Sequence, residues 1–223
     1  MAQIAEDLLL LLLDNASAQP GLDNPRRGRA LAAAVLLDLA YTSRVRPSID
    51  GEPVPPGRLV LLDAAGPPDP VLDPALQYLR RTPRRAGDAI KALAGPSEHR
   101  LFDHLALVGA LRPETVRHRG FRRQRSHPLT DRSRVGPARD ALLAALFDRK
   151  PPAAPTAAII AVLHAVDGLG ALLSLNDRGW RWVHARAGEI AAGSWLDESP
   201  TGLAEVNLAV TASAVRQALA QLS

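Results

Sequence analysis

Apolar residues recur mostly at helical spacing along this chain, and one stretch contains little else. From Arg26 to about Arg44 the interior is nearly all Ala and Leu, and it is preceded by Asn24 as a cap and Pro25 at the first helical position. A helix that is apolar on all sides lies inside the fold. The pattern therefore predicts a central helix.

Two segments lose the helical period. Residues 44–49 and 58–62 flank a turn signal at 50–53, which predicts a β-hairpin, and several prolines restrict that hairpin to a sheet edge. Residues 111–126 predict a second hairpin, with residues 119–121 near its tip.

The rest of the chain is helical in pattern. The N-terminal run of leucines at 8–13 is far shorter than the roughly 20 residues that span a bilayer and follows two acidic residues, so it predicts a core segment, neither a membrane span nor a secretory signal. Gly109 marks the expected end of one helix. Further helices are predicted over residues 71–81, 87–95, 98–111, about 137–148, 156–165, 176–192 and 201–222. Together these patterns predict a mainly α protein: a single helical domain, residues 1–223, around a central helix bundle with two protruding β-hairpins.

Composition narrows the class of protein. The 223 residues are 47% hydrophobic, which is enough to bury a core, and they include no cysteine. A disulfide framework, a zinc ribbon, an iron–sulfur cluster and a thiol nucleophile are therefore excluded, and a cytoplasmic location is expected.

Positive charge is concentrated in one segment. The chain has a net charge of +4, whereas residues 112–139 contain nine Arg against Glu114 and Asp131, a local net of +7. The remaining residues are slightly acidic. The partner of this segment is therefore expected to be anionic.

Signatures of catalysis are missing from the sequence: it has no phosphate loop, nucleophile elbow or His-Glu-x-x-His motif. His99 and His104 are five residues apart, which puts them on different sides of a helix and argues against a shared metal. His164, three residues before Asp167 in an apolar stretch, is interpreted as a core histidine bonded to Asp167 or backbone rather than as half of a catalytic pair. We expect no enzymatic activity, cofactor or metal.

The run RHRGFRRQR at 117–125 is the strongest local signal for function. Its arginines repel one another unless an anion is near, although a solvated loop is the simpler alternative. Single-stranded nucleic acid usually requires several stacking aromatics, and only Phe121 is present, so an anionic membrane surface is favoured. The candidate membrane-contact residues are Arg117, Arg119, Phe121, Arg122, Arg123 and Arg125.

Five stretches, in this order, carry a family resemblance: AEDLLLLLLD (5–14), VLLDLAYTSRV (35–45), PVLDPALQYLRRT (70–82), LVGAL followed by SHPLTD (107–131), and LHAVDGL (163–169). They resemble the Golgi phosphoprotein 3 family, in a bacterial-type member. The resemblance implies a mostly α-helical peripheral membrane protein that recognises phosphatidylinositol 4-phosphate. Eukaryotic members are adaptors that bind the cytoplasmic tails of glycosyltransferases.

The resemblance also implies a headgroup pocket. In the family, a Trp and an Arg near the start of the central helix and an Arg-x-x-Arg pair in a later helix form it, and an apolar hairpin tip before the HPLT motif enters the membrane. Here these pocket positions fall near Asp23, Ala32, Gly95 and Glu98, and the tip reads RGFRRQR. The membrane contribution is therefore expected to shift from insertion towards charge. The candidate headgroup-binding residues are the nearest arginines, Arg26, Arg27, Arg29 and Arg100.

The expected partner is thus an anionic membrane lipid, a phosphoinositide or another acidic phospholipid, bound at the cytoplasmic face of a membrane. Cytoplasmic tails of membrane proteins and a homo-oligomer are further candidate partners, and nucleic acid is not expected. The alternatives left open are a protein-interaction adaptor or oligomerisation module that does not bind lipid and, less favoured, a nucleic-acid-binding protein that uses the same hairpin.

Overall fold

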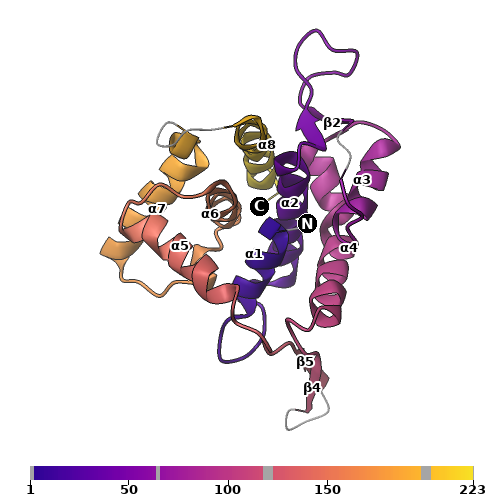
Figure 1. Ribbon diagram of the computed structural model, residues 1–223. Coiled ribbons are helices and arrows are strands. Elements are labelled where there is room, and N and C mark those ends of the chain that lie inside the picture. Colours follow the sequence, from indigo (N-terminus) through magenta and orange to yellow (C-terminus); the bar gives the residue numbers. More distant parts are fainter. Residues whose placement is uncertain (1–2, 64–65, 118–122, 197–201, 223) are drawn as a thin grey trace.

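The computed structural model describes residues 3–63, 66–117, 123–196 and 202–222. Over these residues the chain forms eight α-helices and two small antiparallel sheets (Figure 1). The predicted mainly α fold is confirmed. The helices are α1 (Gln3–Leu13), α2 (Asn24–Tyr41), α3 (Leu72–Arg80), α4 (Ala86–Leu107), α5 (Val135–Phe147), α6 (Ala154–Ala165), α7 (Asp177–Ala191) and α8 (Leu203–Ala220).

Helix α2 is the centre of the core, as its composition predicts. Every residue from Ala30 to Ala40 is buried, and α1, α3, α4, α6 and α8 all pack against it. The cap is Asp23 rather than Asn24, because Asp23 keeps an extended backbone and its carboxylate accepts the Arg26 N–H at 3.0 Å.

Helix α1 buries the leucine run. All six leucines are at most 2% exposed, which confirms the predicted core segment. Among the residues described, no helix is both long and apolar enough to cross a bilayer.

Helix α4 is continuous where the sequence predicts two helices. The prediction of a break at Gly95 and Pro96 is wrong, since Pro96 lies inside a single 22-residue helix. The buried side chains Leu93, Ser97 and Leu101 continue one face of the helix past the proline, and this face packs against α2. Tertiary packing therefore outweighs the local cost of a proline here.

Two hairpins protrude from opposite ends of the helical body (Figure 1). At one end, β1 (Val45–Pro47) pairs with β2 (Arg58–Leu61), and the two-residue strand β3 (Arg84–Arg85) adds to β2, which the sequence does not predict. At the other end, β4 (Glu114–Arg117) pairs with β5 (Arg123–Ser126). Both predicted hairpins are thus present.

Candidate functional site

The β4–β5 hairpin lies beside the loop that joins α1 to α2 and beside the end of α4 (Figure 1). The backbone N–H of His127 donates to the carbonyl of Ala18 at 2.8 Å, and the hydroxyl of Thr130 donates to the carbonyl of Gly109. These contacts tie the hairpin to the helical body. We call this end of the molecule, residues 14–27, 98–117 and 123–132, the hairpin pole.

The register of the hairpin concentrates arginine positions. Arg117 lies directly opposite Arg123, and Thr115 lies opposite Arg125. Because successive strand residues alternate between faces, positions 117, 123 and 125 share one face of the ribbon. Like charges at directly opposite positions are in general unfavourable in a strand pair, and the register places two arginine positions opposite one another.

The remaining members of the predicted membrane-contact set, Arg119, Phe121 and Arg122, lie outside the described residues. For these residues only the sequence is informative: the nine residues 117–125 contain five Arg and no acidic residue.

The positive charge is more local than the sequence predicts. Four of the nine arginines in 112–139 form ion pairs, and three of these four use acids from α1 or from the residue that follows it. The net of +7 therefore overstates the charge available to a partner. The side chains of the other five arginines, which all lie in 117–125, are outside the part of the chain that the structure describes. The pairs are Arg112 with Glu114 (2.6 Å), Arg132 with Asp14 (3.1 Å), Arg134 with Glu6 and Asp7 (2.5 and 2.6 Å), and Arg139 with Asp14 (2.9 Å).

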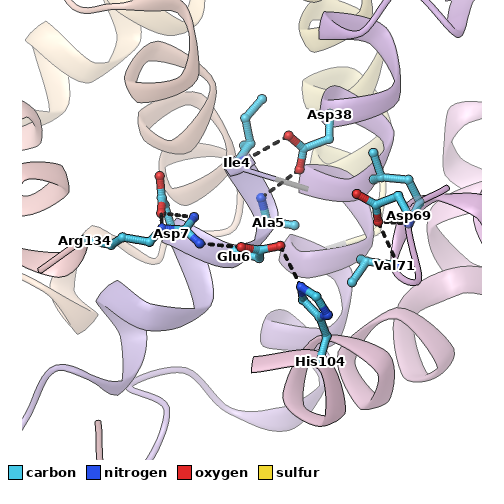
Figure 2. Close-up of polar contacts among 10 residues, drawn as sticks. Ile4, Ala5, Glu6, Asp7, Asp38, Asp69, Val71, His104 and Arg134 are labelled. Atoms are coloured by element: carbon cyan, nitrogen blue, oxygen red, sulfur yellow. Dashed lines mark hydrogen bonds and ion pairs between the residues drawn. The ribbon is translucent and has the colours of Figure 1, made fainter. Parts of the chain in front are cut away.

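The start of α1 is the centre of this acidic network (Figure 2). The buried Glu6 contacts Arg134 through one carboxylate oxygen and His104 Nε2, at 3.4 Å, through the other. Burial raises the pKa of Asp7, and this effect exceeds the lowering effect of Arg134 beside it. These acids hold α4 and the segment after the hairpin against α1.

Asp38 is a buried acceptor that lies inside one of the five family motifs, VLLDLAYTSRV, but to which the sequence assigns no role. It lies in the apolar interior of α2, and its two carboxylate oxygens accept the N–H groups of Ile4 and Ala5, each at 2.9 Å (Figure 2). Burial raises the pKa of this carboxyl well above its ordinary value, against the lowering effect of the two hydrogen bonds. Asp38 thus caps the start of α1 from another helix.

A cavity of about 750 Å³ opens at the hairpin pole between the start of α2, α4 and β4. Among the residues that the structure describes, its charged lining consists of Arg27 with Glu98, Asp103 and Glu114. The place corresponds to the predicted headgroup pocket, but its charge differs from the expected basic one, since acids outnumber arginine in the lining.

Arg27 is held by Glu98. Its guanidinium donates twice to one carboxylate oxygen of Glu98, at 2.6 and 2.8 Å, and also to the carbonyl of Leu22 and the side chain of Asn24. The two charged side chains are only 12% and 19% exposed, so the pair is shielded from solvent. Gly28 faces this contact between α2 and α4, where a Cβ would be in ordinary van der Waals contact, at 3.4 Å, with Ala94 and Glu98.

The other headgroup candidates do not line this cavity. Arg26 pairs with Asp23 at 2.5 Å, and Arg29 donates to the carbonyl of Leu222 near the end of α8. Arg100 is half-buried on α4. The structure therefore does not bring the four arginines together. Glu98, which the sequence marks only as a departure from the family, is the residue that neutralises Arg27.

The histidines do not form a metal site in the part of the chain that the structure describes. His99 pairs with Asp103 at 3.3 Å and His104 with Glu6 at 3.4 Å, pairings that the sequence does not predict. His164 departs from the prediction: its ring lies 5.7 Å from that of His184, and its buried Nδ1 has no hydrogen-bond partner. Burial, His184 and Arg216 lower the pKa of His164.

Comparison with known proteins places this chain in a family. The family model for Golgi phosphoprotein 3 (GPP34) matches residues 4–221, nearly the whole chain. A search of curated proteins found no match. The family match covers α1 through α8 and confirms the resemblance carried by the five sequence motifs. The chain therefore belongs to the Golgi phosphoprotein 3 family.

Proposed function

We propose that this protein is a peripheral membrane protein that binds anionic phospholipid through the arginines of the β4–β5 hairpin. The observation that carries the proposal is the contrast within the basic segment. Its arginines outside the hairpin are engaged by acids, whereas residues 117–125 contain five arginines and no acid. A hairpin that projects from the body can bring this charge to a flat surface (Figure 1).

The electrostatic attraction of five arginines to an anionic leaflet is strong enough for reversible attachment. Each Arg near an anionic leaflet contributes about 1 kcal/mol, so five give about 5 kcal/mol before the cost of immobilising the protein. Such attachment is screened by salt, because the interaction falls off within a Debye length. The protein would therefore associate with acidic membranes reversibly, and more weakly as ionic strength rises.

The headgroup preference follows from the state of the cavity. Since Glu98 neutralises Arg27 and the other candidate arginines do not line the cavity, we propose that charge density rather than a particular headgroup determines binding. Phosphatidylinositol 4-phosphate, which the family resemblance implies, would then bind as one acidic lipid among others.

The remaining parts of the proposal rest on the family. We propose that the protein acts by binding rather than by catalysis, at the cytoplasmic face of a membrane, and that tails of membrane proteins are its candidate cargo. An adaptor that uses the hairpin for protein contacts or self-association, and a nucleic-acid binder, are the competing functions. A vesicle assay separates them from lipid binding.

The test is co-sedimentation of the protein with vesicles of phosphatidylcholine alone, with added phosphatidylglycerol, and with phosphatidylinositol 4-phosphate at equal total charge. We expect no pelleting with neutral vesicles and similar pelleting with the two acidic kinds, weakened as salt is raised. Equal pelleting with neutral and acidic vesicles would contradict the proposal. Strong preference for the phosphoinositide at equal charge would contradict the proposal that charge density determines binding.

A further inference from the structure

The end of α4 exposes an apolar pair at the hairpin pole. Leu107 is 85% exposed and Val108 is 57% exposed. They are consecutive, and both precede the segment that enters the hairpin. Large apolar side chains this exposed lie outside the core, so packing within the described chain does not explain them.

Helix geometry explains why they face outward. Leu101 and Leu105 lie four residues apart on the buried face of α4, and both are completely buried. Leu107 follows Leu105 by two residues, a rotation of about 200° around the helix, which directs it away from the core. Gly109, at a φ of +74°, then turns the chain towards the hairpin.

The backbone holds this pair in a fixed position. The Val108 N–H donates to the carbonyl of His104 at 2.9 Å, and the Ala110 N–H donates to the carbonyl of Leu105 at 2.8 Å. The chain that follows is anchored by the bridge between Leu111 and Leu129. The pair is therefore part of a rigid helix end rather than of a loose loop.

We infer that Leu107 and Val108 enter the border of the acyl region when the hairpin arginines engage an anionic bilayer. The occupant is identified by charge complementarity. The exposed apolar pair stands at the base of a hairpin whose residues 117–125 contain five arginines and no acid, so an anionic surface that the hairpin meets is within reach of the pair. Stable attachment to a membrane generally takes two signals, one electrostatic and one apolar. This inference rests on the proposed function and assigns its second signal.

The test compares the partition of the full chain and of the variant Leu107→Ser with Val108→Ser into phosphatidylcholine–phosphatidylglycerol vesicles, at low salt and at about 1 M salt, where the Debye length is about 3 Å. Both side chains are exposed, so the variant is expected to fold. The matched control is Leu203→Ser with Val206→Ser, which removes an exposed pair that is 88% and 43% exposed on α8.

We expect the wild type to keep part of its binding at high salt and the Leu107/Val108 variant to lose that part, with a partition coefficient lowered roughly 10-fold or more at both salt concentrations. The α8 variant should behave as wild type. Unchanged partition of the Leu107/Val108 variant would overturn the inference, as would a change in its molar mass in solution without a change in binding, which would assign the pair to a contact between copies. Failure of the wild type to bind acidic vesicles even at low salt would overturn the proposed function and this inference with it.

Discussion

Replacing Arg117, Arg123 and Arg125 by serine should lower the partition of the protein into acidic vesicles roughly 100-fold, because each replacement removes about 1 kcal/mol of attraction to the surface. These three positions share one face of the β4–β5 ribbon, and two of them lie directly opposite one another. The measurement is a binding isotherm by co-sedimentation with phosphatidylglycerol-containing vesicles at low salt. The variant should also show a weaker dependence on salt, since fewer charges remain to be screened.

A charge-matched control separates position from net charge. Arg80 at the end of α3, Arg81 directly after it and Lys91 on α4 are exposed away from the hairpin pole, and changing all three to serine removes the same formal charge. This control should retain most of the binding of the wild type. Equal losses in the two triple variants would mean that the protein is attracted through its overall charge, which would contradict a role for the hairpin.

Removing the carboxyl of Asp38 should produce a loss of stability that is large for a single substitution. Asp38→Ala leaves the N–H groups of Ile4 and Ala5 buried without their acceptor, at a cost of about 1–3 kcal/mol each. We therefore expect the free energy of unfolding to fall by about 2–5 kcal/mol, measured by urea denaturation followed by circular dichroism. A loss below about 0.5 kcal/mol, which is ordinary for a surface substitution, would contradict the capping role.

Asp38→Asn is the matched variant, since its one amide oxygen can still accept an N–H from the start of α1, and it should lose less stability than the alanine. The stability that Asp38 contributes should depend on pH in a definite direction. Burial raises the pKa of Asp38 in the folded state above its pKa in the unfolded chain. The contribution of Asp38 to the free energy of unfolding is therefore fully present below the pKa of the unfolded state, and it is lost as pH rises through the pKa of the folded state. The stability of the wild type relative to Asp38→Asn should therefore decrease as pH rises from acid towards neutral. An increase over that range would contradict a raised pKa.

The architecture could be predicted because it depends on local patterns. The Ala and Leu content of α2 predicts its central place, and the leucine run of α1 predicts a buried segment, since both express burial directly in composition. The two hairpins follow from the loss of helical period between turn signals. Gly95 and Pro96 misled the prediction of α4, because the buried face on either side of them is set by contact with α2 rather than by the local sequence.

The candidate site could be predicted only in part, because its electrostatics depend on residues far apart in the chain. Arg27 and Glu98 are separated by 71 residues, and Arg134 and Glu6 by 128. Sequence alone counts all of these arginines as free charge, whereas the fold engages them with acids. The exposure of Leu107 could be predicted from its position two residues after the buried Leu105. That prediction, however, requires knowing first which face of α4 is buried.

Fluorescence from a single labelled position tests the central claim most directly, because the chain contains no cysteine and accepts one without background. An environment-sensitive label would be attached to Thr115→Cys, exposed in β4 at the hairpin pole, and in a second sample to Asp50→Cys, exposed in the hairpin at the opposite end. On addition of acidic vesicles, we expect the emission at position 115 to increase and shift to the blue while that at position 50 stays unchanged. An equal change at both positions, or a change at position 50 alone, would contradict the claim that the β4–β5 hairpin is the face that meets the membrane.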